Sequence, residues 1–324
     1  ANILCVFLFI KGERFMKHYT QFLKDFMSRY SYPEIAVETF SRVLKRLDEE
    51  KDFGDKIDEL VTAYMNPENE ELGPFLDKVT ELSKEYNENE YTMHFIFLLL
   101  CTPILKENYE KAGISEYLYW DTMDDLRCKL KECIDCEEVA GTFVAGWFNG
   151  FFKLERFAYG RFQYEISDCR TEKDYVLSCG KVVKDGDTYI GFHIPSSGIP
   201  LTDDVRLDSY KKAYQAYKHL FPDGIVIFGC GSWLLYPPHY DFLPENSNIL
   251  KFMSDFEIVK YKSKDEFSDG WRVFAKDSDL PIDQLPRNTS LRRAFADWQK
   301  QLQLTLVMTA RIMTPVRKYR YQIR

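Results

Sequence analysis

The stretch from Tyr189 to Phe256 constrains the fold more than any other part of the chain. Tyr189–Ile194 is a short apolar run that stops at Pro195. From Asp203 to about Pro222, aromatic and alanine side chains recur at spacings of three and four, which predicts a helix. Ile225–Leu235 is rich in Ile, Val, Phe and Trp, as a buried strand is. A strand, a crossover helix and a second strand form a parallel pair. The loop after the first strand is where such a fold holds a ligand.

Further strands are predicted on both sides of this stretch. Gly160–Ile166 alternates apolar and polar residues, and Tyr175–Val183 reads as a second strand. A hairpin signal at Asp185–Gly186–Asp187 leads into Thr188–Ile194, so three antiparallel strands precede the helix. Two more strands are predicted near the carboxyl end of the chain, at Glu257–Tyr261 and Trp271–Ala275.

The rest of the chain separates into helical and irregular parts. Residues 16–137 read as about six helices whose outer faces interleave acidic and basic residues. Residues 141–152 are aromatic and glycine-rich and fit either a helix or a first strand. A last helix is predicted from Thr289 to about Leu304. The overall expectation is an α+β protein with a helical N-terminal domain and a mixed α/β C-terminal domain.

Bulk properties exclude several classes of partner. The 324 residues suggest two domains, and the net charge of −8 argues against a nucleic-acid surface. No apolar run approaches eighteen residues, so no membrane span is expected. Eight scattered cysteines favour a reducing cytoplasm. Cys128, Cys133 and Cys136 have a spacing like that of iron–sulfur ligands, but their segment has a helical pattern, so we expect no metal site.

Six segments carry a resemblance to a known family through their order and spacing. They are residues 193–201, the helix with Ser209, Tyr210 and Ala213, residues 230–238, the helix start at 247–249, residues 271–274 and residues 285–291. Together they resemble bacterial two-domain acyltransferases with a helical N-terminal domain and a GNAT-like C-terminal domain, related to the general-control type of N-acetyltransferase. The resemblance spans about Phe22 to Leu291.

The sequence pattern and the resemblance together suggest four parts of the chain. Residues 16–137 would form the helical domain and residues 138–304 the GNAT-like domain. Residues 1–15 are expected to be an added upstream segment, with an edge strand as the alternative. Residues 305–324 are expected to form a basic tail, because Arg311–Arg324 contains five basic residues and no acidic one.

The resemblance also implies an acyl-CoA site between the two parallel strands. Pantetheine would lie between two short segments, and the pyrophosphate would sit at the loop and helix start, where amide hydrogens are unpaired. The expected contacts are His193, Ile194, Ser196, Ser197, Gly198 and Leu201 on one side, and Cys230 and Ser232 on the other. One feature departs from many GNAT enzymes: the glycine-rich turn is missing, and Asp203 and Asp204 stand near the helix start, with Lys211 or Lys212 as possible cationic help.

Catalysis of this kind needs a base for the amine proton and an acid for the leaving thiolate. His193 and Glu165 rank first as the base; their alternatives are a loop hydrogen bond and a surface pair with Arg161, respectively. Tyr240 and Ser247 are candidate acids because they follow the second parallel strand. Cys230 as a nucleophile is less favoured than a buried strand thiol.

Two functions are therefore predicted. The first is an acyl-CoA-dependent N-acyltransferase acting on an unidentified small amine or amino compound. The alternative is a catalytically degenerate GNAT-fold binding or regulatory module, which the missing glycine-rich turn favours.

Overall fold

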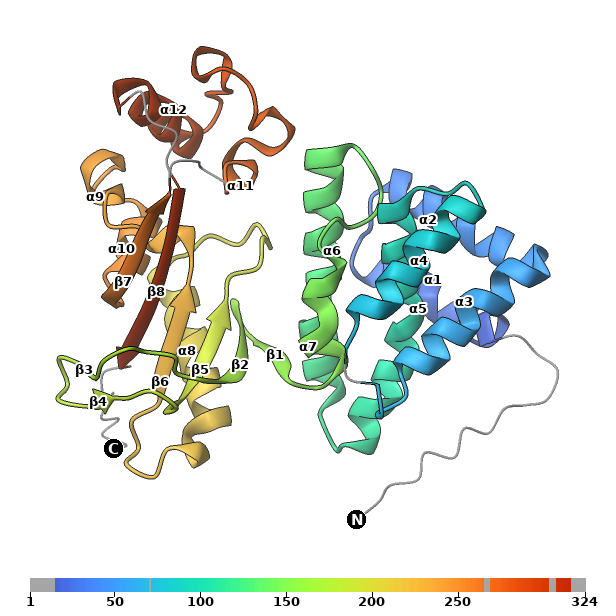
Figure 1. Ribbon diagram of the computed structural model, residues 1–324, viewed down its shortest axis with the longest axis horizontal. Helices are drawn as coiled ribbons and strands as arrows, with labels where there is room; N and C mark the ends of the chain where they lie inside the picture. The colour runs from blue at the N-terminus through green and yellow to red at the C-terminus, as the bar shows by residue number, and fades with distance from the viewer. Residues whose placement is uncertain (1–14, 70, 265–268, 303–306, 316–324) are drawn as a thin grey trace. The chain divides into compact units, whose positions relative to one another are not determined.

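The computed structural model describes residues 15–69, 71–264, 269–302 and 307–315 (Figure 1). A helical region precedes a mixed sheet with helices, so the α+β prediction is confirmed. The chain forms two compact units. One contains the residues up to Ile114 together with Val139–Lys153, and the other contains Ser115–Glu138 and the residues from Leu154 onward.

The first unit is built from five long helices. They are α1 (Phe15–Arg29), α2 (Glu34–Glu49), α3 (Lys51–Tyr64), α4 (Gly73–Glu85) and α5 (Glu90–Lys111). Helix α5 is apolar on all sides and contacts the other four, which explains why its middle is fully buried. The Asn89 side chain accepts a hydrogen bond from the Thr92 amide and begins α5.

The glycine-rich segment after Val139 is helical where it is regular. It forms the 3₁₀ turn η1 (Ala145–Phe148) and the short helix α7 (Asn149–Phe152), which decides between the two alternatives left by the sequence. Gly141 is required here, because a Cβ atom on it would lie 2.4 Å from the Tyr91 backbone.

Helix α6 (Glu116–Glu137) belongs to the second unit. The Ser115 side chain caps it, and it ends at Glu138, whose φ of 57° is left-handed. The Thr122 hydroxyl accepts a hydrogen bond from the Ala158 amide at 3.0 Å, which fixes α6 to the first strand of the sheet. Helix α6 precedes the expected domain boundary near residue 137 but belongs to the second unit, and residues 139–153 follow it but belong to the first. The boundary itself stays a prediction.

A six-stranded sheet forms the centre of the second unit. Its order is β1 (Arg156–Tyr159), β2 (Phe162–Asp168), β5 (Thr188–His193), β6 (Ile227–Gly231), β8 (Val307–Pro315) and β7 (Glu257–Lys264). Among the described strands, β5 and β6 alone pair in parallel, and α8 (Asp203–Tyr217) connects them. The predicted strand–helix–strand unit is therefore confirmed.

Two predicted strands are wrong. Tyr175–Val183 forms only β3 (Tyr175–Val176) and β4 (Val182–Val183), which make a separate hairpin. Gly180, at a φ of 86°, donates its amide to the Leu177 carbonyl and turns the chain back. Residues 271–275 contain helix α11 (Trp271–Phe274), because the Phe274 amide bonds to the Gly270 carbonyl and closes a helical turn.

The structure describes only part of the two predicted terminal segments. Residues 307–315, which belong to the expected basic tail, form β8 between β6 and β7. Residues 305–306 and 316–324 lie outside the described residues, as does the expected upstream segment apart from Phe15.

The remaining elements of the second unit are short, apart from α12. They are η2 (Lys218–Leu220), η3 (Trp233–Leu235), α9 (His239–Phe242), α10 (Asn248–Met253), η4 (Ala275–Asp277), η5 (Ile282–Gln284) and α12 (Ser290–Leu302). No helix within the described ranges combines the length and apolarity needed to span a bilayer.

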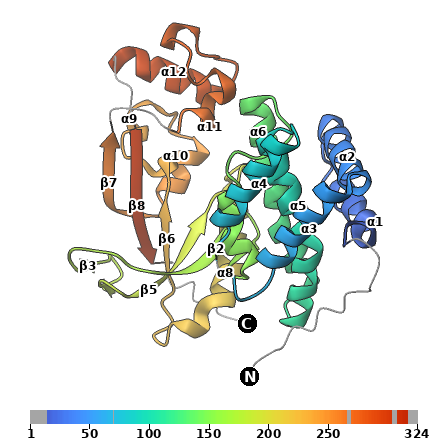
Figure 2. The same ribbon diagram turned by 45° about the vertical axis from the view of Figure 1, so that its right-hand side comes forward.

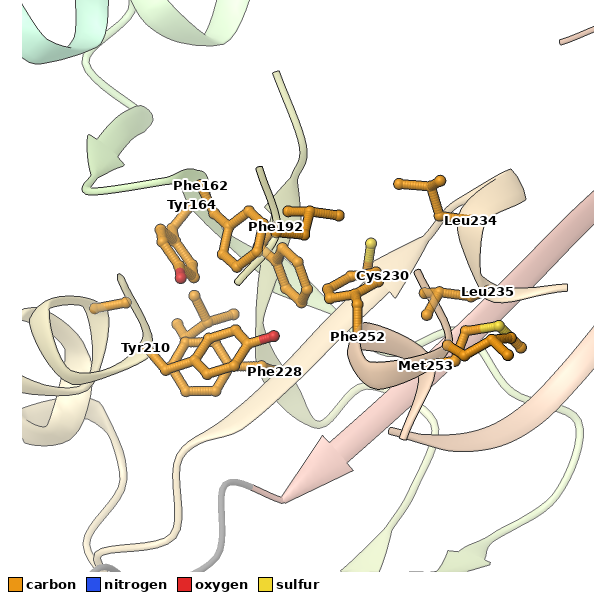
Figure 3. Packing of buried hydrophobic residues seen from close by; sticks show 14 of the residues in the cluster. Phe162, Tyr164, Phe192, Tyr210, Phe228, Cys230, Leu234, Leu235, Phe252 and Met253 are labelled. Atoms are coloured by element: carbon orange, nitrogen blue, oxygen red, sulfur yellow. The ribbon is translucent and has the colours of Figure 1, made fainter. Parts of the chain in front are cut away.

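One face of the sheet is filled by the hydrophobic core. The buried side chains at even-numbered positions of three strands pack in this core with residues of α8 and α10, and many of them are aromatic (Figure 3): Phe162 and Tyr164 of β2, Ile190 and Phe192 of β5, and Phe228 and Cys230 of β6. Phe162 lies 5.1 Å from Phe192 and 5.5 Å from Tyr210 between ring centroids. Because side chains alternate along a strand, the odd-numbered residues face the opposite side. That side carries Gly191, Gly229 and Gly231, and we call it the glycine face.

Candidate functional site

Three ionisable side chains meet on the glycine face. Glu165 of β2 lies opposite Arg156 of β1 and opposite Gly191 of β5. Its Oε1 is 2.8 Å from Nε2 of His193, and its Oε2 is 2.8 Å from Nε and 2.6 Å from Nη2 of Arg156. The carboxylate therefore joins a guanidinium and an imidazole across three strands. All three side chains are at most one-third exposed.

Gly191 provides the space in which Glu165 reaches His193. A Cβ atom on Gly191 would lie 2.9 Å from Oγ of Ser167 and 3.5 Å from Cγ of Glu165. A strand glycine commonly marks a place where another group approaches the backbone closely. Here the closest group is Oγ of Ser167, and the Glu165 side chain lies beside it at ordinary contact distance.

Glu165 is held in its charged form. Burial, the largest influence, opposes ionisation, but the hydrogen bond and charge of His193 together with Arg156 outweigh it and lower the pKa of Glu165 below its usual value. A carboxylate only accepts hydrogen bonds, so Nε2 of His193 donates its proton to the bond with Glu165. This bond fixes the orientation of the imidazole ring.

The parallel strands stop pairing beside this group. Within the described residues, β5 and β6 pair at Ile190 with Phe228 and at Gly191 with Gly229. His193 and Gly231 lie beyond the last registered pair, although each still belongs to its strand. The expected gap between the strands therefore starts next to His193.

The loop after β5 is held by two buried arginines. Nη1 and Nε of Arg161 donate to the carbonyls of Pro195 and Ile199, at 2.8 and 3.0 Å. Nη1 of Arg206 donates to the Leu201 carbonyl at 2.7 Å, while Asp255 binds the same guanidinium. The loop conformation is therefore set by charged donors that bind its carbonyl oxygens.

The predicted phosphate-binding residues lie on the outer side of this loop. Ser196 and Gly198 are exposed, and Oγ of Ser197 accepts from the Ile199 amide at 3.3 Å. Gly198 has a φ of 81°, and nothing lies within 4 Å of a Cβ atom placed on it. The backbone is thus open to a ligand at Gly198.

The start of α8 carries competing carboxylates. The Thr202 side chain and then the Val205 amide lower the pKa of Asp204, so this carboxylate occupies part of the helix start. Asp203 pairs with Arg206 at 3.1 Å. Lys212 pairs with Asp208 at 2.7 Å, so its charge is directed at this carboxylate.

Other predicted site residues have different contacts. Tyr240 lies on α9 and is 55% exposed. The hydroxyls of Ser232 and Ser247 accept from the amides of Leu234 and Ile249 and cap η3 and α10. Cys230 is buried, and its burial raises the pKa of its thiol, as expected for a strand thiol that packs in the core.

The structure corrects the predicted partner of Glu165. Arg161 lies in the turn before β2 and binds the loop carbonyls, so it is not the arginine that pairs with Glu165. Arg156 takes that place. Arg156 and Gly191 were not predicted as site residues, because their positions follow from the registers of β1 and β5. In the sequence, the one sign of a role for Arg156 was a charged residue directly before the apolar run Phe157–Tyr159.

Cysteine positions agree with a helix. Cys128, Cys133 and Cys136 all lie on α6, and the first two are buried. Among the described residues, no group of three or more His, Cys, Asp or Glu side chains could hold a metal ion.

Comparison with known proteins covers most of the chain. Residues 21–154 match the N-acyltransferase N-terminal domain, and residues 157–306 match the GNAT-like C-terminal domain. No curated protein matches. The two domain matches agree with the resemblance found in the sequence.

Solved structures show the same fold. An acyltransferase mutant in complex with octanoyl-CoA is 17% identical, with a TM-score of 0.68 over 91% of this chain and 88% of that chain. An acyltransferase in complex with decanoyl-CoA and teicoplanin is also 17% identical, with a TM-score of 0.58 over 90% and 99%. An acyltransferase in complex with decanoyl-CoA is 19% identical, with a TM-score of 0.58 over 90% and 98%.

Proposed function

We propose that this chain, which combines an N-acyltransferase N-terminal domain with a GNAT-like C-terminal domain, transfers an acyl group from acyl-CoA to the amine of a small molecule. The observation that carries this proposal is the Arg156–Glu165–His193 group beside the end of the β5–β6 pairing. A base at this position is next to the gap in which the thioester would lie.

Each charged residue has a separate role in the proposed reaction. The amine attacks the thioester carbonyl carbon, and the C–N bond forms while His193 accepts the amine proton. The tetrahedral intermediate then expels the CoA thiolate as the C–S bond breaks, and the proton passes to that thiolate. Glu165 orients His193 and stabilises its protonated form, and Arg156 keeps Glu165 ionised. Tyr240 and Ser247 remain the candidates for the acid.

Acyl-CoA is the proposed co-substrate. The structurally similar acyltransferases contain octanoyl-CoA or decanoyl-CoA, which supports a medium-chain donor. The exposed Gly198 backbone and the loop carbonyls bound by Arg161 support a pyrophosphate site on the outer side of the loop. The proposed contacts are His193, Ile194, Ser196, Ser197, Gly198, Leu201, Cys230 and Ser232.

The proposed acceptor is a small amino compound. One similar acyltransferase contains teicoplanin together with decanoyl-CoA, which supports a small-molecule acceptor. We place the reaction in a reducing cytoplasm, because the seven cysteines of the described residues are free thiols.

A second candidate function is a GNAT-fold binding module without turnover. Asp204 at the start of α8 favours it, because a carboxylate there repels a pyrophosphate. Calorimetry with decanoyl-CoA, followed by a thiol-release assay with amines, separates the two. We expect binding together with amine-dependent release of CoA. Binding of decanoyl-CoA without release of CoA would support the binding module. If no acyl-CoA binds, both the proposed co-substrate and the proposed reaction are wrong.

A further inference from the structure

A pocket of about 750 Å³ lies on the glycine face of the second unit. Among the residues with described side chains, its floor includes Tyr189 of β5, residues 229–231 of β6 and Val259 of β7. Its wall is the connection between β2 and β5, which carries the β3–β4 hairpin. Both ribbon views place this hairpin near the lower ends of β6 and β8 (Figures 1 and 2). The volume is within the range of sites for small molecules.

The pocket adjoins the proposed reacting groups. Glu165, Gly191 and Gly229 form one row across β2, β5 and β6, and Gly229 is part of the pocket floor. Gly229 and Gly231 place no side chain of β6 on this face. A molecule in the pocket can therefore extend along the sheet toward His193.

Charged side chains surround the other end of the pocket. The lining includes Asp168, Arg170, Glu172, Lys173 and Asp185. Asp185 accepts from the Thr171 amide at 3.0 Å, and Lys173 lies 5.7 Å from the centre of the Tyr175 ring. Arg170 and Glu172 are exposed. A fatty-acyl chain here would place hydrocarbon against charged groups, so the lining favours a polar ligand.

The strand register gives the length of that ligand. Asp168 lies opposite Thr188, five residues before His193, which is about 16 Å along the strand. An extended Arg170 side chain can bridge about 6 Å of this span of about 16 Å. The remaining length of about 10 Å is that of an extended tripeptide.

We propose that this pocket holds the acceptor, and that the acceptor is a zwitterion of about tripeptide length. Its amine points along the glycine floor toward His193, and its carboxylate pairs with Arg170. This inference rests on the proposed acyl transfer. It adds the substrate class and assigns the recognition of the acceptor carboxylate to Arg170.

Triglycine tests the proposal, with triglycinamide and glycine as matched probes. Triglycinamide lacks the carboxylate, and glycine is too short to reach Arg170 from His193. In a thiol-release assay with decanoyl-CoA, we expect kcat/KM for triglycine to exceed that for either probe by about 10-fold or more, as a charged hydrogen bond of this kind contributes. Equal rates for triglycine and triglycinamide would overturn the proposal, as would bound decanoyl-CoA with no release by triglycine.

Arg170→Gln assigns the carboxylate contact. We expect it to raise KM for triglycine to the level for triglycinamide, while kcat and the Kd of decanoyl-CoA stay unchanged. Lys184→Gln is the control, because Lys184 is an exposed cation of the same connection outside the pocket lining. If Arg170→Gln leaves KM for triglycine unchanged, Arg170 does not recognise the acceptor.

Val259→Trp fills the pocket and distinguishes its two possible occupants. We expect release by triglycine to be lost, while decanoyl-CoA and acetyl-CoA bind as they do to the wild type. A loss of affinity for decanoyl-CoA but not for acetyl-CoA would show that the pocket holds the acyl chain and would overturn the proposal. If the wild type binds no acyl-CoA, the proposed reaction itself fails, which is a separate result.

Discussion

At the scale of single residues, Glu165 connects the proposed base to the rest of the sheet. Its carboxylate binds the guanidinium of Arg156 on one side and the imidazole of His193 on the other. A partly buried carboxylate with two such partners stays ionised, although burial opposes this. Its charge therefore contributes both to the stability of the fold and to the orientation of the base.

The lowered pKa of Glu165 predicts a pH-dependent contribution to stability. The group contributes fully above its unfolded pKa of about 4.5, and the contribution is lost as the pH falls through the folded pKa. At pH 7, Glu165→Gln should lower the free energy of unfolding by about 1–3 kcal/mol. The difference from wild type should shrink below pH 4.5. Urea unfolding at several pH values measures it.

The exposed Glu172 provides the control for this experiment. Glu172→Gln should have a much smaller effect that varies little with pH. A difference between Glu165→Gln and wild type that stays constant from pH 7 to pH 3.5 would contradict the account.

Replacing Gly191 by alanine, the smallest residue with a Cβ atom, should lower turnover. In Gly191→Ala, the new Cβ atom would clash with Oγ of Ser167, which must move, and would contact Glu165 at an ordinary distance. We expect turnover to fall about 10-fold, because the shift of Ser167, two residues from Glu165 on the same strand, disturbs the group that orients His193. Ser167→Ala in the same chain removes the closer contact and should restore part of the activity. Turnover equal to wild type in Gly191→Ala would show that this close approach has no role.

At the scale of elements, the sequence predicted the strands and helices that have a clear periodic pattern of apolar residues. Strands β2, β5 and β6, helix α8 and the parallel pairing follow from alternation, helical spacing and the rules for crossovers. The predicted strand at 271–275 is a helix, because a short apolar run fits either structure. Strand β1 has only four residues, too few for a pattern.

The candidate site was predictable to a similar degree. His193 and Glu165 were identified because each has a suitable side chain near the end of a predicted strand. Arg156 and Gly191 were not identified, because cross-strand neighbours depend on the register. The register is set by pairing between β1, β2 and β5, which a single sequence does not give.

The loop between β5 and α8 should bind the donor through its backbone. Gly198→Glu adds a negative charge and a side chain at a φ of 81°, where a residue other than glycine is strained. We expect binding of decanoyl-CoA to be lost, with an unchanged far-UV circular dichroism spectrum. Asp204→Asn should tighten binding modestly, because it removes a negative charge near the proposed pyrophosphate. Calorimetry measures both variants.

Gly180 offers a matched control for this substitution. It also has a positive φ, of 86°, and open space around its Cα, but it lies in the turn between β3 and β4. Gly180→Glu should bind decanoyl-CoA as the wild type does. If Gly198→Glu also binds normally, the donor site is not at this loop.

At the scale of the whole molecule, two compact units divide the chain, and the proposed chemistry is within one of them. The second unit contains the Arg156–Glu165–His193 group, the loop after β5 and the pocket on the glycine face. The two domain matches together cover residues 21–154 and 157–306, so nearly the whole chain agrees with a two-domain acyltransferase architecture.

The central claim is that His193 is the base for acyl transfer, and His193→Ala tests it most directly. With decanoyl-CoA and an amine, kcat should fall about 10²-fold or more, while the Kd of decanoyl-CoA stays unchanged. His219→Ala, which changes an exposed histidine of η2, should match the wild type in both quantities. Full turnover in His193→Ala, combined with its loss in Glu165→Gln, would contradict the account and transfer the role of the base to Glu165.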